Sequence, residues 1–132
     1  MATRALQKPR PKAVRPRVKL WLEAGDESVF CRGLCDMLQA VDETGSIQEA
    51  AVSVGRSYRF VWSRIKEAER AIGATLVETQ VGGADANRSR LSPLARDLVG
   101  HFDELRTEVH RLVDGVFARR LSATLRRHGH RG

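Results

Sequence analysis

The sequence is poor in residue types that define whole classes of protein. Only two of its 132 residues are cysteine, too few for a disulfide framework. No apolar run approaches the roughly 18 residues needed to cross a bilayer. The basic N-terminus is followed by no apolar stretch and no small-residue cleavage site, so it does not resemble a secretory signal. These absences predict a cytoplasmic chain with reduced thiols.

Acidic residues are missing from the first 22 positions, which carry seven Lys or Arg. The first carboxylate is Glu23, so this segment accounts for the whole net charge of +7. Residues 20–55 then hold one Arg against seven acids, whereas residues 56–96 hold eight basic residues against four acids. Residues 119–132 add five Arg and no acid. A basic arm and a basic middle predict a polyanion as partner.

The N-terminal region divides into an arm and a strand. Residues 1–16 mix three of the four prolines with five Lys or Arg, a composition that cannot bury enough apolar surface to fold. We expect a disordered arm. Residues 17–23 alternate with the period of a half-buried strand that ends at Gly25-Asp26, its apolar side being Val18, Leu20 and Leu22.

Two helices are predicted next. A first helix from about Ser28 to Glu43, stopping at Thr44-Gly45, is indicated by the helical spacing of Phe30, Leu34, Met37, Leu38 and Val41. It would carry both cysteines, Cys31 and Cys35. Ser46 and Glu49 form a capping box that opens a short second helix to about Val54.

A third helix is predicted from an N-cap at Ser57 to Gly73. Its buried stripe consists of Val61, Ile65, Ala68 and Ile72. At 100° per residue, the opposite face is polar and basic, with Arg59, Ser63, Lys66 and Arg70. Tyr58 and Trp62 lie on the border between the faces; packing against the first helix is favoured over flanking a groove.

A hairpin and a long helix complete the chain. Residues 75–80 and 90–92 are predicted strands around a long, Gly-containing loop at 81–89. Ser92-Pro93 then opens a long helix to about Leu121. Its heptad-like apolar seam would be a large exposed stripe in a monomer, so we expect a homodimer through Leu98, Phe102, Leu105, Val109, Leu112 and Val116.

This order of elements predicts a mainly α fold with a small β wing, a winged helix-turn-helix followed by a long dimerisation helix. The expected divisions are a basic arm at 1–16, the winged domain at 17–92, the dimerisation helix at 93–124 and a basic tail at 125–132. The third helix would enter the major groove of double-stranded DNA. The predicted DNA-binding residues are Ser46, Ser57, Tyr58, Arg59, Ser63, Arg64, Lys66, Arg70, Arg88 and Arg90.

A combination of short segments carries a family signal over about residues 17–105. The segments are Lys19-Leu20-Trp21-Leu22-Glu23, residues 41–47, Ser57-Tyr58-Arg59 with Trp62, Ile65 and Glu69, then Leu76-Val77-Glu78, Gly82-Gly83 and Leu91-Ser92. Together they resemble the N-terminal DNA-binding domain of the ModE-type molybdenum-dependent transcriptional regulators, related to the LysR-type winged helix. The chain departs from that pattern at Ala84-Asp85-Ala86-Asn87, where the family has a glycine run, and at Pro93-Leu94-Ala95-Arg96, where it has Thr-x-x-Gly.

Taken together, the sequence predicts a cytoplasmic, nucleoid-associated transcriptional regulator that reads paired half-sites as a homodimer. The resemblance implies a DNA-binding module without the family's molybdate-binding domain, so a separate protein would sense any effector. No cofactor and no metal are predicted.

Two alternatives remain open at this stage. A metal- or redox-responsive regulator would use Cys31 and Cys35 with histidines such as His101 and His110. An architectural protein would coat DNA without sequence preference through its basic arm and C-terminal arginines. Catalysis is not expected, because no nucleophile, base and orienting group converge and no phosphate-loop or HExxH motif occurs.

Overall fold

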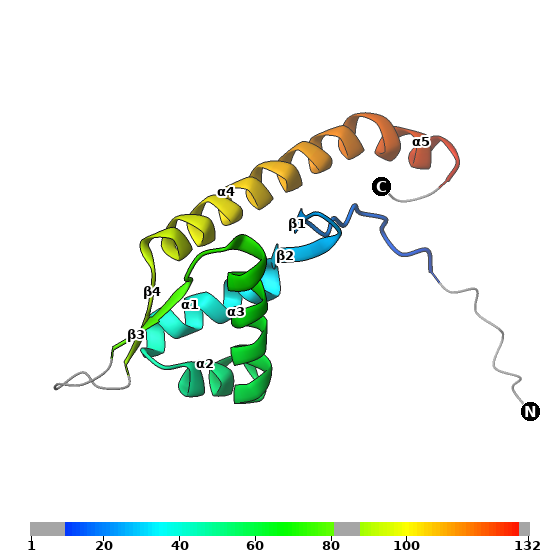
Figure 1. Ribbon diagram of the computed structural model, residues 1–132. Helices are drawn as coiled ribbons and strands as arrows, with labels where there is room; N and C mark the ends of the chain where they lie inside the picture. The colour runs from blue at the N-terminus through cyan, green and yellow to red at the C-terminus, as the bar shows by residue number, and fades with distance from the viewer. Residues whose placement is uncertain (1–9, 81–87, 130–132) are drawn as a thin grey trace, which may run out of the picture. The chain divides into compact units, whose positions relative to one another are not determined.

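The computed structural model describes residues 10–80 and 88–129, which form a mainly helical fold with two small hairpins (Figure 1). The order of elements is that of the predicted winged helix-turn-helix, followed by the predicted long helix. Residues 19–106 make one compact unit; the described part of a second unit comprises residues 10–18 and 107–129. Across the described ranges, no helix is long and apolar enough to cross a membrane.

The N-terminal hairpin corrects the predicted start of the first helix. Strands β1 (Trp21–Ala24) and β2 (Glu27–Cys31) pair antiparallel around Gly25, whose φ of +61° suits the turn. Residues from Ser28 to Cys31 are therefore strand, not helix. The position of Phe30 fits the apolar spacing of a helix and that of a strand. Pairing with β1 selects the strand, and β1 lies outside the local pattern of residues around Phe30. The predicted strand at 17–23 is paired only from Trp21 onward, although its alternating burial holds.

Helix α1 (Arg32–Thr44) supplies the centre of the core. Its inward face consists of Leu34, Cys35, Met37, Leu38, Ala40 and Val41. The helix ends as predicted at Gly45, which has a left-handed φ of +78° and donates its N–H to the Val41 carbonyl at 2.8 Å. Cys31 stands at the N-cap and not inside the helix. The expectation that one helix carries both cysteines is therefore wrong.

Helices α2 (Ile47–Val54) and α3 (Tyr58–Ile72) begin after the predicted N-cap residues Ser46 and Ser57. Only one half of the predicted capping box is formed, because the Ser46 N–H donates to the Thr44 hydroxyl at 3.4 Å and not to the Glu49 carboxylate. The Ser46 hydroxyl accepts the Glu49 N–H at 2.9 Å, and the Ser57 hydroxyl accepts the Phe60 N–H at 3.1 Å. The buried stripe of α3 is confirmed for Val61, Ile65 and Ala68, while Ile72 is half-buried.

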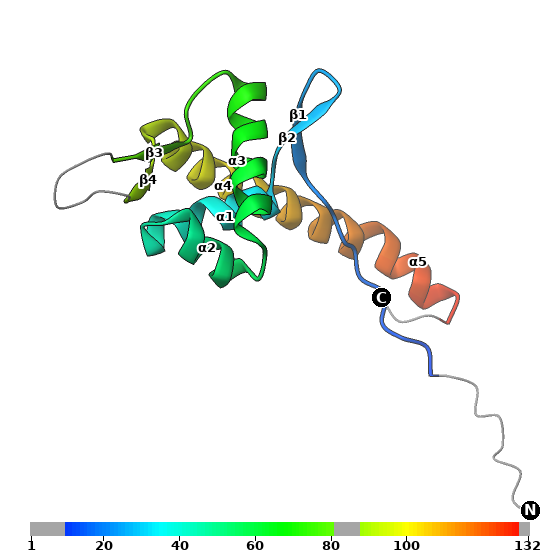
Figure 2. The ribbon, with the colours of Figure 1, turned by 60° about the horizontal axis from the view of Figure 1, so that its bottom comes forward.

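The predicted second hairpin is confirmed in strands β3 (Val77–Thr79) and β4 (Ser89–Leu91). The predicted loop around Gly82-Gly83 lies outside the described residues. In both Figure 1 and Figure 2 this hairpin and the β1–β2 hairpin lie on opposite sides of the body formed by α1, α2 and α3.

Helix α4 (Pro93–Val116) is opened by Ser92, whose hydroxyl accepts the Ala95 N–H at 3.1 Å. Its N-terminal half packs inward through Ala95, Val99 and Phe102. The Phe102 ring meets the Phe30 ring edge to face, with centroids 5.1 Å apart. Phe102 is therefore a core residue without free surface, which corrects its place in the predicted dimer seam, and Leu98 also packs against the core.

The predicted long helix is interrupted after Val116. A π-helical turn (η1, Phe117–Leu121) follows, and α5 (Ser122–Arg127) continues from it. The Ser122 N–H donates to the Phe117 carbonyl five residues back, which is the bond that defines a π turn. Apolar spacing does not distinguish this bond from the ordinary α-helical one, so the π turn was not predictable from the residue pattern.

Truncating a side chain at the centre of the core should strongly destabilise residues 19–106. Leu38 is fully buried, so we expect Leu38→Ala to lower the free energy of unfolding by about 2 to 5 kcal/mol, measured by urea denaturation. Val52→Ala, at a position 79% exposed, is the control and should change it by less than about 0.5 kcal/mol. Equal losses in the two variants would contradict this assignment of the core.

Candidate nucleic-acid interface

The outward face of α3 is polar and basic, as the sequence predicted. The buried stripe fixes the helix rotation and leaves Arg59, Lys66 and Arg70 exposed and Ser63 half-buried. The Ser57 cap satisfies one N–H of the first turn, and Arg59 follows two residues later. A helix start of this kind, with free amides beside a guanidinium, suits an anionic group.

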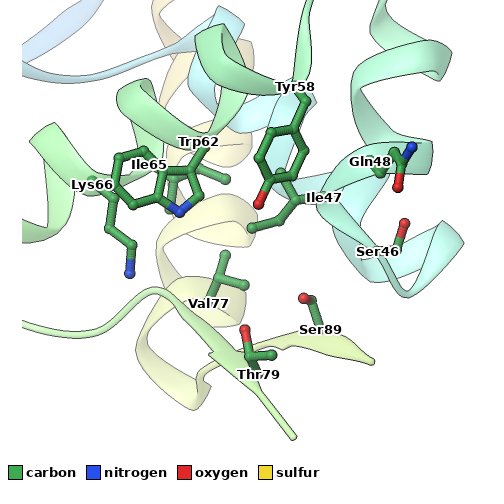
Figure 3. A pocket seen from close by; sticks show the side chains of 10 residues that line it. All are labelled: Ser46, Ile47, Gln48, Tyr58, Trp62, Ile65, Lys66, Val77, Thr79 and Ser89. Atoms are coloured by element: carbon green, nitrogen blue, oxygen red, sulfur yellow. The ribbon is translucent and has the colours of Figure 1, made fainter. Parts of the chain in front are cut away.

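The turn between α1 and α2 places a second capped helix start beside α3. Gly45 reverses the chain in the left-handed region, and the Thr44 hydroxyl donates to the Ala40 carbonyl at 2.7 Å. Ser46 then begins α2 through its bond to the Glu49 N–H. This geometry brings Ser46 and Gln48 to the same side of the molecule as the start of α3 (Figure 3).

A hollow of about 270 Å³ lies between α2, α3 and the β3–β4 hairpin. In Figure 3 the Tyr58 ring and the Trp62 indole stand side by side along it, and Thr79 and Ser89 face them from the strands. Tyr58 is 52% exposed and Trp62 43% exposed. The expectation that both pack against the first helix is therefore wrong, because they lie on the edge of α3 that faces the hairpin.

Glu69 joins the recognition-helix candidate α3 to the hairpin. Its carboxylate accepts the N–H groups of Leu76 and Val77 at 2.7 and 3.2 Å, and it pairs with Lys66 at 3.1 Å. Lys66 also lies 5.8 Å from the centroid of the Trp62 ring. Sequence reasoning did not assign Glu69 this role; its place three residues after Lys66 indicates the ion pair but not the bonds to Leu76 and Val77.

The predicted basic set divides between two sides of α3. Arg64 turns toward β2, where its guanidinium lies 3.7 Å from Glu67 and 3.8 Å from the Cys31 sulfur. It does not line the hollow, unlike Ser46, Tyr58 and Lys66. Arg59, Ser63 and Arg70 do not line the hollow either, so of the residues predicted on α3 it brings together Tyr58 and Lys66.

Arg88, directly before β4, and Arg90, within it, flank the buried Ser89. The Ser89 N–H donates to the Gly45 carbonyl at 2.8 Å, which ties this strand to the turn before α2. Arg90 pairs with Glu78 across the hairpin at 3.4 Å. The hairpin thus holds two guanidinium groups beside the helix-turn-helix.

The cysteines and histidines form no recognisable metal centre in residues 10–80 and 88–129, where no three side chains of metal-binding type gather. Both thiols are free. Burial raises the pKa of the Cys35 thiol, and the carboxylates of Asp36 and Asp103 raise it further. This thiol is therefore protonated at neutral pH, with its sulfur 3.9 Å from the Val99 carbonyl oxygen.

Removing Glu69 should loosen the hairpin. Glu69→Ala leaves the fully buried Leu76 without a partner for its N–H, so we expect a loss on the order of 1 to 3 kcal/mol in urea denaturation and faster amide exchange at Leu76 and Val77. Glu67→Ala is the matched control on the same helix, since Glu67 has a single exposed ion pair. Unchanged exchange in Glu69→Ala would refute the link.

Comparison with known proteins gives one matching family. Residues 34–95 match the bacterial regulatory helix-turn-helix proteins of the lysR family. The matched segment runs from α1 through the hairpin to the start of α4. It includes the whole candidate interface, both helix caps and the hollow.

Two curated relatives are similar over part of their length. The molybdenum transport protein ModE of Herbaspirillum seropedicae is 36% identical over 69 residues, which is 52% of this chain and 26% of that protein. The molybdenum-pterin-binding protein MopB of Rhodobacter capsulatus is 29% identical over 77 residues, 58% of this chain and 28% of that protein. The chain spans about a quarter of the length of these relatives. The predicted resemblance to ModE-type regulators is confirmed.

A solved structure shares the fold. The crystal structure of the CbnR_DBD–DNA complex aligns with a TM-score of 0.51 and 17% identity, covering 65% of this chain and 93% of that one. This likeness confirms the predicted fold class, a winged helix-turn-helix with a long C-terminal helix.

Proposed function

Because residues 34–95 match the bacterial regulatory helix-turn-helix proteins of the lysR family, we propose that this chain is a sequence-specific, DNA-binding transcriptional regulator acting at the nucleoid in the cytoplasm. The observation that carries the proposal is the exposed basic face of α3, framed by the capped start of α2 and by the β3–β4 hairpin. A helix presented in this way matches the width of the DNA major groove.

In this proposal Arg59 reads bases. It lies in the first turn of α3 and is exposed, and a guanidinium at such a position can bond both acceptors on the guanine edge. Lys66 lies two turns further along and is exposed, and in this proposal its ammonium, positioned by the ion pair with Glu69, contacts a phosphate. Ser46 and Ser57, at the two helix starts, add phosphate contacts through their hydroxyls and neighbouring amides.

The aromatic wall of the hollow gives the interface an apolar component. Tyr58 and Trp62 present exposed ring surface beside the hydroxyls of Thr79 and Ser89. Rings at the edge of a recognition helix can make apolar contacts with thymine methyl groups and sugars. Basic side chains do not recognise these apolar groups. Base preference would therefore depend on these two rings together with Arg59.

The proposal includes a homodimer that reads paired half-sites. On α4, Leu105 is 41% exposed and Leu112 is 65% exposed, while Val109 and Val116 are half-buried. Large apolar side chains that recur along one helix and remain exposed favour burial against a second copy. A two-fold axis between two such helices would match a pseudo-palindromic DNA site.

A sequence-independent architectural role is the second candidate. It is favoured by the exposed guanidinium groups that follow α4, namely Arg119, Arg120, Arg126 and Arg127. Phosphate attraction by such a segment needs no base contact. Sequencing of DNA fragments selected by the pure protein separates the candidates, because a regulator enriches a common site and an architectural protein does not.

Arg59→Ala should weaken binding to the selected site by on the order of 1 to 3 kcal/mol and relax base preference at one position, because a bidentate base contact is lost. Fluorescence anisotropy with the selected and a scrambled duplex measures both effects. Arg32→Ala removes the same charge from an exposed position on α1 and should change the two affinities equally. Wild-type affinity of Arg59→Ala for the selected site would remove α3 from the base-reading interface.

Leu105→Asp combined with Leu112→Asp should give a monomer that binds the paired site at least tenfold more weakly, since charge on this seam prevents apolar burial. Sedimentation measures the association. Thr107→Asp with His110→Asp adds the same charge at exposed positions turned away from the seam and should remain dimeric. A monomeric wild type would refute the proposed dimer.

A further inference from the structure

The β3–β4 hairpin has a second face, turned away from α3, that carries the predicted DNA-binding residues Arg88 and Arg90. Side chains alternate along strands, so Thr79 and Ser89 face α3 whereas Glu78 and Arg90 point the other way. On this second side lies a polar hollow of about 310 Å³. Its lining includes Arg88, Arg90 and Arg96 together with Asp42, Gly45 and Gln80.

Three segments distant in the sequence build this hollow. Arg88 and Arg90 come from the hairpin, Arg96 from the first turns of α4, and Asp42 from the last turn of α1. The hydrogen bond from the Ser89 N–H to the Gly45 carbonyl fixes the hairpin against the end of α1. The three guanidinium groups therefore converge on a backbone framework that is already held in place.

Gly45 makes room for one of these groups. A Cβ at this position would lie 3.3 Å from both Nε and Nη2 of Arg88, so the guanidinium rests against the turn itself. The same residue has a φ of +78°, which a side chain would also disfavour. The turn that begins α2 thus also supports an arginine of the second hollow.

Two of the three arginines are paired with carboxylates. Arg96 Nη2 lies 3.2 Å from Asp42 Oδ1, and Arg90 Nε lies 3.4 Å from Glu78 Oε2. Both arginine side chains are more than half exposed, so each pair is worth little in water. Three guanidinium groups against two carboxylates leave the cluster with a net positive charge, and an anionic partner can compete with either carboxylate for its arginine.

We propose that this hollow seats a phosphate group, namely a backbone phosphodiester of the DNA next to the segment that α3 reads. Guanidinium groups bond phosphate oxygens in bidentate fashion, as they bond carboxylates, and a DNA backbone presents several phosphates in a row. In this arrangement Arg96 is a DNA contact outside the hairpin and outside the helix-turn-helix, and Asp42 competes with the phosphate for it. The DNA source rests on the proposed function; the phosphate chemistry of the hollow does not.

The test measures DNA affinity as a function of salt for two opposite changes. Arg96→Gln should weaken binding about three- to tenfold on selected and scrambled duplexes alike and reduce the slope of log affinity against log salt by about one. Asp42→Asn should instead tighten binding about two- to fivefold, because it frees Arg96. The tightening is the distinctive result, since damage to the fold would not produce it.

Matched variants separate this contact from the general effect of charge. Arg32→Gln and Asp36→Asn make the same charge changes at exposed positions on α1, and their effects should be clearly smaller. If Asp42→Asn and Asp36→Asn changed DNA affinity equally, or if Arg96→Gln and Arg32→Gln did, the proposed phosphodiester contact in the hollow would be wrong. Thermal melts of all four variants verify that each one is folded.

A second measurement distinguishes the sources of the phosphate. Titration of the DNA-free protein with inorganic phosphate, followed through the arginine Nε–H signals in NMR, reports on the hollow alone. Saturable chemical-shift changes in the wild type that are absent in Arg96→Gln support phosphate recognition by the hollow. If the DNA affinity of Arg96→Gln is also unaltered, the hollow binds a free phosphate ion and not the DNA backbone. If the wild type binds no DNA the proposed function fails, and this titration still decides the hollow. No response in either measurement overturns the proposal.

Discussion

The hydrogen bond between the Ser89 N–H and the Gly45 carbonyl joins the two halves of the interface. Gly45 ends α1, turns the chain in the left-handed region and allows Ser46 to cap α2. Ser89 begins the returning strand of the hairpin. Because one bond links both, the start of α2 and the hairpin keep a fixed relation, and a hollow opens on each face of the hairpin.

Glu69 makes the second link and changes the electrostatics of α3. Its carboxylate holds two N–H groups at the start of β3 and also engages Lys66, so part of the basic face is neutralised within the domain. Arg59 in the first turn has no such role and is exposed. Exposed guanidinium groups are therefore available near both ends of the helix, Arg59 beside the exposed rings of Tyr58 and Trp62 and Arg70 in the last turn.

Helix α4 divides its apolar residues between two tasks. Ala95, Val99 and Phe102 complete the core of residues 19–106, where Phe102 meets Phe30. Leu105 and Leu112 remain exposed further along. A single heptad-like pattern therefore contains both core residues and exposed residues. The change from buried to exposed side chains comes after Phe102, the last residue of α4 in the core.

Local physical chemistry in the sequence determined the helices, their caps and the hairpin. Glycine at a left-handed position, serine before a helix and apolar residues at helical spacing each act within a few residues, so α2, α3 and the start of α4 were predictable. Residues 27–31 were not, because Phe30 suits both periods and pairing with Trp21–Ala24 selects the strand. Likewise, only the fold turned Tyr58 and Trp62 toward the hairpin, buried Phe102 and brought Asp42, Arg88 and Arg96 together, since these contacts join segments far apart in the chain.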